Sequence, residues 1–320
     1  MGGNKFSSSV DLQYVNLLDE VLIEGFEYND PNRKGVKRLQ IPHATVKFDL
    51  SDGTFPAINL RKVSPKVAFA EFSAFFQNKY TLHELEEMGC KFWRKDAFRF
   101  HKKTKGYPHS FEKFEEELPD VDMGMIYPKQ MYEFGGINGP WEDSGYDQVN
   151  SVLDEILEHP FGTKRTVTMW NPNDAEKMAL TPCHWSFELV TYKSPDGESK
   201  LDLVWHQHSV DLFLGLPYNF MYYGYALHYF AMFLGFTPGN LVGHLTNVHL
   251  YDNQWDAAAE VKLRYFEGEV SDKRSPALEW MEFPRVVESF EDFVLKSKVK
   301  VVNYHPLPAV TGIEMLTYTE

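Results

Sequence analysis

The residue with the clearest capacity for chemistry is Cys183, which follows a proline in the stretch MALTPCHWSFELV and precedes a strand-like run. A cysteine thiolate is a soft nucleophile that can form a covalent intermediate with an electrophilic carbon. The alternative for an isolated cysteine is a buried structural residue, because free cysteine is among the most buried residue types. We interpret the second cysteine, Cys90 in EEMGCKFW, as structural.

A candidate acid or base lies further upstream in the sequence. Glu71 occurs in the run AFAEFSAFF, with Phe69, Phe72 and Phe75 close by. Apolar neighbours disfavour a charged carboxylate, so this setting is typical of a glutamate with a raised pKa. A solvent-facing glutamate on a helix is the alternative interpretation.

Side chains that could bind a substrate follow in two later motifs. Asn219 in LPYN offers a donor and an acceptor on one amide, although asparagine is also a good helix cap. His249 and Tyr251 in VHLY are two residues apart, so a strand would place both on one face. The alternative for this pair is a place in the core.

Elements of both kinds must position these residues. Helical spacing and caps predict helices at 10–25, 64–78, 216–236 and 255–266, and alternation predicts strands at 44–50, 166–171, 185–192, 200–213 and 242–251. The apolar segment 216–236 contains Asn219 and several tyrosines, which favour a buried central helix over a membrane span. Hairpins interleaved with long helices indicate an α+β fold with the helices on one side of a sheet.

Composition restricts the class of protein. The 320 residues are 43% hydrophobic, with no linker and no repeat, and we predict a single domain over residues 1–320. A formal net charge of -14 argues against nucleic acid as a partner. Two cysteines cannot form a disulfide framework, and MGGNKFSSSV does not resemble a secretion signal. We therefore expect the protein to be located in a reducing cytoplasm, which would be that of the host cell if a phage encodes the chain.

Three ordered blocks, MALTPCH, VDLFLGLPYN and VHLYDNQ, resemble the signature blocks of thymidylate synthases, together with the upstream glutamate helix and IYPKQ. The resemblance extends from the N-terminal helix to YHP near residue 305. Members of this family use 5,10-methylenetetrahydrofolate to add one carbon to C5 of deoxyuridylate. The resemblance implies a mixed sheet covered by long helices and a homodimer that pairs sheet to sheet. It also implies that the ligands are small molecules, a nucleotide and a folate, and that the protein does not associate with a membrane.

The resemblance also implies roles for individual residues. Cys183 would add to C6 of the uracil ring, after which C5 attacks the methylene group and a base removes the C5 proton. Glu71 matches the glutamate that organises water and proton transfer at the pyrimidine carbonyl, and Tyr127 matches a tyrosine near the C5 proton. Asp211 and Trp93 match positions that contact the folate, and we count Asp211 with the catalytic residues too.

Three further matches concern the nucleoside. Asn219 matches the asparagine that reads O4 and N3 of uracil. Relatives that act on cytosine are similar to this chain but have an aspartate at this position. His249 and Tyr251 resemble the pair that binds the deoxyribose 3'-hydroxyl. Together they imply a uracil deoxynucleotide as the substrate.

The phosphate site departs from the family pattern. Family members use four arginines, two of them from the partner subunit, and an arginine fork is not reproduced by lysine or histidine. In this chain, Arg33 matches the first of these arginines. Thr163 and Lys164 stand at the positions of the two arginines from the partner subunit, and Arg165 follows one residue later. His208, which precedes Ser209, stands at the fourth position. A regular strand would place the last two on opposite faces, so both reach one phosphate only if the strand kinks or bulges.

The end of the chain departs as well, because an atypical tail, LPAVTGIEMLTYTE, begins at about residue 307. Asn247 also replaces an aspartate that is usual in the family. A site that admits water would hydrolyse the methylene intermediate to a hydroxymethyl product, whereas a dry site allows hydride transfer. We therefore expect a deoxyuridylate hydroxymethylase that gives 5-hydroxymethyl-deoxyuridylate. The alternatives are thymidylate synthase and a catalytically inactive binding or scaffold member.

Histidines raise the separate question of a metal. His206, His208, His244 and His249 lie in WHQHS and GHLTNVH, but their spacing is not specific for zinc. We predict no metal site.

Overall fold

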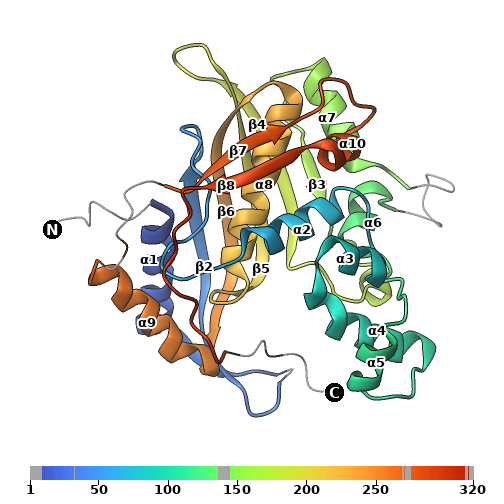
Figure 1. Cartoon of the computed structure of the whole chain (residues 1–320), viewed down its shortest axis with the longest axis vertical. Helices are drawn as coiled ribbons and strands as arrows, with labels where there is room; N and C mark the ends of the chain where they lie inside the picture. The colour runs from blue at the N-terminus through green and yellow to red at the C-terminus, as the bar shows by residue number, and fades with distance from the viewer. Residues whose placement is uncertain are drawn as a thin grey trace.

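The computed structural model describes residues 9–31, 33–135, 145–268, 270, 275–313 and 316. Six strands form one mixed sheet in the order β1-β2-β6-β5-β4-β3 (Figure 1). Their bounds are Phe26–Asn29 for β1, Lys37–Asp49 for β2, Thr166–Thr168 for β3, His184–Lys193 for β4, Ser199–Asp211 for β5 and Thr237–Tyr251 for β6. Neighbouring strands are antiparallel except β5 and β6, which are parallel. The predicted α+β fold with a mixed sheet is confirmed.

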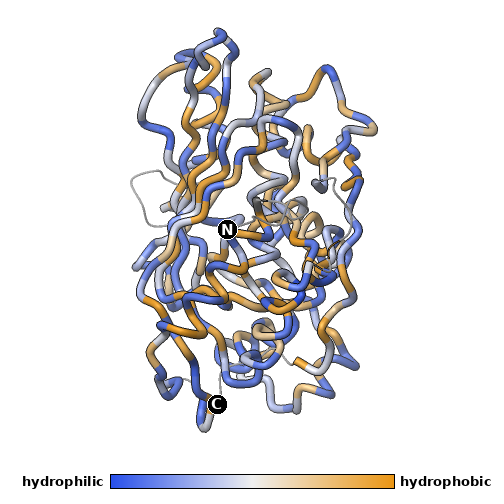
Figure 2. Tube along the Cα trace, turned by 90° about the vertical axis from the view of Figure 1, so that its left-hand side faces the viewer, coloured by the Kyte–Doolittle hydropathy of each residue, from blue (hydrophilic) through white to orange (hydrophobic). Residues whose placement is uncertain are grey.

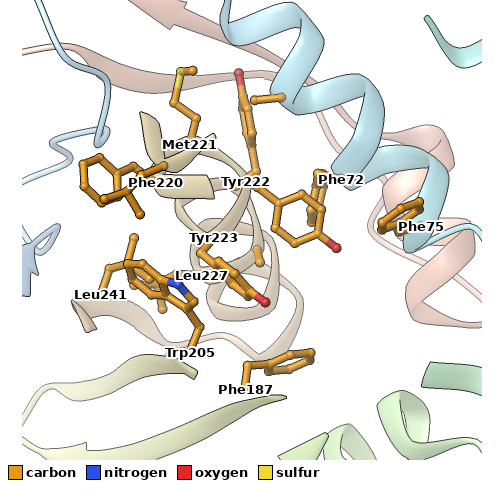
Figure 3. Close-up of a cluster of buried hydrophobic side chains, with 14 of the residues drawn as sticks. Phe72, Phe75, Phe187, Trp205, Phe220, Met221, Tyr222, Tyr223, Leu227 and Leu241 are labelled. Atoms are coloured by element: carbon orange, nitrogen blue, oxygen red, sulfur yellow. The ribbon is translucent and has the colours of Figure 1, made fainter. Parts of the chain in front are cut away.

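Parallel strands need a long crossover, and helix α8, Leu216–Leu234, provides it between β5 and β6. Figure 3 shows α8 packed between the sheet, which contributes Trp205 and Leu241, and helix α2, Pro65–Phe75, which contributes Phe72 and Phe75. Most residues of α8 are buried on all sides, so this helix is the centre of the core. The part of the chain that is described contains no helix long and apolar enough to cross a membrane.

The remaining elements surround this core. The other helices are α1, Ser9–Glu24; α2, Pro65–Phe75; α3, Leu82–Met88; α4, Arg94–Lys105; α5, Phe111–Glu117; α6, Tyr127–Tyr132; α7, Gln148–Glu158; α9, Trp255–Phe266; and α10, Phe290–Lys296. Strands β7, Ala277–Glu282, and β8, Lys298–Val302, form a separate two-stranded sheet. Helix α1 lies against β2, and α9 lies against α1 (Figure 1).

One face of the large sheet is buried and the other is not. On β2, Val46 and Phe48 are buried whereas Thr45 and Lys47 are exposed. Hydrophobic and hydrophilic positions accordingly alternate along the chain in Figure 2. We call the side of the sheet away from α8 the outer face. The sheet thus has its helices on one side, as the sequence predicts.

The central strands kink at one level. Ser209 on β5 and Asn247 on β6 both have a positive φ, of 53° and 52°, and the pairing of the two strands passes from His208 and Thr246 to Val210 and Val248. Asparagine tolerates this left-handed conformation better than most residues. The kink that our prediction required for His208 and Ser209 is therefore present. Beyond it the strands carry the predicted site residues.

The element bounds differ from prediction mainly at strand ends. Strand β2 starts at Lys37 rather than at 44, and β3 ends at Thr168 rather than at 171. Helix α9 matches its predicted range, and α8 ends at Leu234, two residues early. The hairpin between β4 and β5 is confirmed.

Candidate active site

Cys183 immediately precedes β4 and is held from two sides by its own backbone. Its N–H donates to the hydroxyl of Tyr127 at 2.8 Å, and its carbonyl accepts from the N–H of His208 at 2.9 Å. Helix α6 and strand β5 thereby fix the start of β4, and Cys183 as a whole residue is only partly buried. By contrast, Cys90 is fully buried, and burial raises the pKa of its thiol far above the ordinary value.

The histidine next to the cysteine is not its base. His184 is buried, its Nδ1 lies 2.8 Å from the hydroxyl of Tyr223, and burial lowers its pKa to about 3. It therefore stays neutral and cannot pair with a thiolate as an imidazolium. Burial and the carboxylate of Asp96 raise the pKa of Cys183 to about 11, while Arg33 acts to lower it. A cation near the sulfur is thus important for forming the nucleophile.

Glu71 lies in an apolar setting on α2. Burial raises its pKa to about 7, although the indole N–H of Trp93 donates to its Oε1 at 3.3 Å and opposes this shift. The ring of Trp93 also packs edge-on against Tyr127 with 6.3 Å between ring centres, and the Tyr127 hydroxyl binds the N–H of Cys183, so Glu71, Tyr127 and Cys183 share one site. The ring of Tyr127 stacks on His184 with 4.4 Å between centroids. A carboxyl group with a pKa near neutrality is suited to accept and return protons there.

The amide of Asn219 is oriented by a chain of hydrogen bonds. The indole N–H of Trp205 donates to Oε1 of Gln207 at 3.2 Å, and Nε2 of Gln207 donates to Oδ1 of Asn219 at 3.0 Å. An indole can only donate, so this end of the chain fixes the orientation of both amides. Asn219 is left with its NH2 group to donate and one lone pair to accept. Sequence reasoning missed Gln207, because its role depends on a contact between strand β5 and Asn219 on helix α8.

The ring of His249 is oriented in the same way. Its Nδ1 donates to the carbonyl of Asn247 at 2.9 Å, since a carbonyl can only accept. Nε2 is then an acceptor, and it is buried without a hydrogen-bond partner. Burial lowers the pKa of His249, which keeps the ring neutral. The ring of Tyr251 packs edge-on at 4.8 Å, so the predicted pair does lie together.

Asp211 has a structural role that the sequence did not predict. Its Oδ1 accepts from the backbone N–H groups of Phe213 and Leu214, at 3.1 and 2.8 Å. Gln254 donates to both carboxylate oxygens, and its own Oε1 accepts from the N–H of Tyr251. Asp211 therefore closes the turn into α8. Its contact with the folate, like that of the buried Trp93, stays a prediction.

The residues predicted to bind the phosphate occupy different environments in the structure. Arg33 lies near the site, because its guanidinium carbon is 4.8 Å from the ring centre of Tyr251 and its charge acts on Cys183. Lys164 is exposed and lies two residues before β3. His208 is half-buried, contacts Trp170 edge-on at 5.3 Å between ring centres, and has its pKa lowered by burial. Ser209 is exposed at the kink.

The prediction for Arg165 is wrong. Its guanidinium is buried and forms an ion pair with Glu155. It also donates to the carbonyls of His159 and Pro160 and to the hydroxyl of Thr191. These contacts use all three nitrogens to hold the loop after α7 against β4. Arg165 is therefore a structural residue.

The tail beyond β8 crosses the segment that leads into α2. The hydroxyl of Tyr304 bonds to the backbone of Val63, and the N–H of Leu307 donates to the carbonyl of Asn59 at 2.8 Å. Arg33 donates from Nε to the carbonyl of Leu316 at 3.2 Å. The atypical tail thus returns to the site. Residues 314, 315 and 317–320 lie outside the described residues.

Within the described ranges, no three His, Cys, Asp or Glu side chains are grouped to hold a metal ion. His206 and His244 face each other on β5 and β6 with 5.3 Å between ring centres. His249 belongs to the site described above.

Comparison with known proteins is consistent with this arrangement. A sequence profile described as thymidylate synthase matches residues 12–315. A probable thymidylate synthase of Escherichia phage T5 is 28% identical over 303 residues, which are 93% of this chain and 97% of that protein. The thymidylate synthase of Enterobacteria phage T4 is 30% identical over 79% of this chain and 80% of its own length. That of Symbiobacterium thermophilum is 32% identical, with coverage of 78% and 82%.

Proposed function

Because this chain belongs to the thymidylate synthase family, we propose that it transfers a one-carbon unit from 5,10-methylenetetrahydrofolate to C5 of deoxyuridylate and forms thymidylate. Family membership makes it a one-carbon transferase that uses this folate as co-substrate. The nucleotide and the product belong to the proposal. The observation that carries it is the convergence of Cys183, Tyr127 and Glu71 at one site, through the hydrogen bond from Cys183 to Tyr127 and through Trp93, which contacts both Tyr127 and Glu71.

The thiolate of Cys183 starts the reaction by adding to C6, which makes C5 a nucleophile. The neutral thiol predominates in the free protein, because its pKa is about 11. Positive charge from Arg33 favours the thiolate, and a proton acceptor is needed as the bond to C6 forms. The folate supplies the one-carbon unit and, for a methyl product, the hydride.

Glu71 and Tyr127 handle the protons. A pKa of about 7 lets Glu71 exchange a proton at the pyrimidine carbonyl without a large free-energy cost in either direction. Tyr127 keeps its proton, since burial raises its pKa well above the ordinary value. Its hydroxyl already accepts from the N–H of Cys183, so it can donate to a water or base at C5.

The nucleoside is recognised by two oriented side chains. The NH2 group of Asn219 suits the O4 acceptor of uracil, and its remaining lone pair suits N3–H. Cytosine presents an amino donor and an unprotonated N3, which match neither. The buried Nε2 of His249 accepts from a hydroxyl, which we assign to the 3'-hydroxyl of the sugar.

A hydroxymethyl product is the weaker reading. The tail that suggested an open site returns to Arg33 and packs on the segment before α2, and the relatives named above are thymidylate synthases. These observations support closure and a methyl product. We also propose that two copies pair through their outer faces, which would bring Lys164 of one copy towards the phosphate site of the other.

Incubation of the protein with deoxyuridylate and methylenetetrahydrofolate tests the proposal. We expect thymidylate by mass spectrometry and one dihydrofolate per product, detected by absorbance. A 5-hydroxymethyl product without dihydrofolate would reject the methyl route and retain the family chemistry. No product from deoxyuridylate would reject the proposed substrate.

A further inference from the structure

Arg38 is a cation at the edge of the site that no sequence motif marks. It lies on β2 directly opposite Tyr251 on β6, two residues before Gln40, which pairs with His249. Cross-strand partners in an antiparallel pair point to the same side, with their Cβ atoms about 5 Å apart. The side chain of Arg38 therefore starts beside the two residues that we assign to the sugar.

Arg38 and Arg33 are held by the same carboxylate. Nη1 of Arg38 lies 3.1 Å from Oδ2 of Asp30, and Nη1 of Arg33 lies 3.3 Å from the same oxygen. The side chain of Asp30 is completely buried. One carboxylate thus keeps two guanidinium groups close together, and Arg33 is also fixed over the ring of Tyr251.

The ion pair does not satisfy Arg38. Its Nε is buried without a hydrogen-bond partner, although 23% of the side chain is exposed. A guanidinium has five N–H donors, and a buried donor without a partner costs free energy. The positive charges of Arg38 and Arg33 both act to lower the pKa of His249. A donor, a charge and partial exposure thus coincide next to the sugar-binding residues.

We propose that Arg38 is a second phosphate-binding residue that, with Arg33, holds the phosphate of the uracil nucleotide. The inference rests on the proposed function and names how this chain compensates for Thr163 and His208, which stand where the family has arginines. A phosphate monoester offers oxygens to both forks, and such charge-assisted bonds are among the strongest hydrogen bonds. The same chemistry would suit a 5'- or a 3'-phosphate.

The test measures dissociation constants by calorimetry for deoxyuridine 5'-phosphate, deoxyuridine 3'-phosphate and deoxyuridine. The variants are Arg38→Gln, Arg38→Lys and the control Lys37→Gln. Lys37 is the adjacent cation and pairs with the exposed Glu27 at 2.8 Å. We expect Arg38→Gln to weaken the binding of one of the two nucleotide monophosphates by roughly 10- to 100-fold and to leave the dissociation constant of deoxyuridine unchanged.

Arg38→Lys keeps the charge and loses the fork, so it should show a smaller loss than Arg38→Gln. Lys37→Gln should bind all three ligands like wild type. Equal losses for deoxyuridine and its phosphates would mean that Arg38 only supports the structure, and unchanged phosphate binding would also overturn the inference. If Arg38→Gln does not fold, the Arg38→Lys result decides in the same way. Failure of wild type to convert deoxyuridylate at all would instead reject the proposed function.

Discussion

Gln207 donates a hydrogen bond from Nε2 to Oδ1 of Asn219 at 3.0 Å, and it is itself fixed by the indole of Trp205. A single donor-only group thereby sets the orientation of two amides in series. Asn219 presents its NH2 group as a consequence, which is the arrangement that distinguishes uracil from cytosine. Under the proposed function, base specificity in this chain therefore depends on Gln207, a residue that need not touch the base.

The first prediction removes that support. Gln207→Met should leave Asn219 able to turn its amide over, because the side chain keeps its length but loses the donor. We expect kcat/KM for deoxyuridylate to fall about 10-fold, as for loss of a positioned hydrogen bond. The measurement is the ratio of kcat/KM for deoxyuridylate to that for deoxycytidylate, which should decrease. An unchanged ratio would show that Asn219 does not need Gln207.

The second prediction concerns the stability cost of Glu71. Its pKa rises from an ordinary 4.5 to about 7 on folding, so the native state binds the proton more tightly than the unfolded state. The protein therefore loses stability from this group as pH rises from 4.5 to 7. Glu71→Gln should raise the free energy of unfolding at pH 8, by up to about 3 kcal/mol, and change it little at pH 4.5. Turnover should fall sharply in the same variant.

Denaturant unfolding at both pH values checks this, with Glu87→Gln as the control, because Glu87 is a solvent-exposed glutamate on the neighbouring helix α3. Equal stability of Glu71→Gln and wild type at pH 8 would contradict a desolvated carboxyl group with a raised pKa.

The third prediction concerns His208. Burial lowers its pKa, so the imidazole is neutral in the free protein at neutral pH. A bound phosphate favours the charged form, so binding takes up a proton and deoxyuridylate affinity should weaken as pH rises from about 6 to 8. His208→Arg should flatten this profile and bind more tightly at the upper end. Deoxyuridine, which lacks the phosphate, should show no such dependence, and coinciding profiles for the two proteins would place His208 away from the phosphate.

The fourth prediction tests the proposed homodimer. Val204 and Val242 are direct partners on β5 and β6, and Val204 alternates with the buried Leu203 and Trp205, so it points to the outer face. Val204→Glu would bury charge between two copies and should convert a dimer to a monomer with loss of activity. Sedimentation velocity measures the change. Val286→Glu, at a side chain that is 86% exposed, is the matched control and should stay dimeric.

Parts of the fold follow from local signals and parts do not. Helix α9 and the ends of α8 were predictable from periodicity and from Pro217 and Gly235. Strand β1 gives no alternation, because all four of its residues are exposed. Helices α3, α5 and α6 have only seven, seven and six residues, so an apolar helical pattern does not repeat over enough turns to predict them.

The candidate site likewise contains residues that local sequence predicts and residues that it does not. Cys183, Glu71 and Asn219 stand out because their types are unusual in their local sequence. Gln207 and Arg38 do not, since the role of Gln207 depends on its contact with Asn219 on helix α8, and that of Arg38 on its pairing with the distant strand β6. Arg165 was misassigned because a pattern cannot show that a guanidinium turns inward to Glu155.

The most direct test of the account follows tritium released from C5 of deoxyuridylate in the presence of methylenetetrahydrofolate. Adduct formation at C6 must precede loss of the C5 proton, so release reports the thiolate chemistry whichever product forms. The account predicts release by wild type and by Cys90→Ala, and none by Cys183→Ala. Substantial release by Cys183→Ala would contradict the assignment of Cys183 as the nucleophile and with it the proposed reaction.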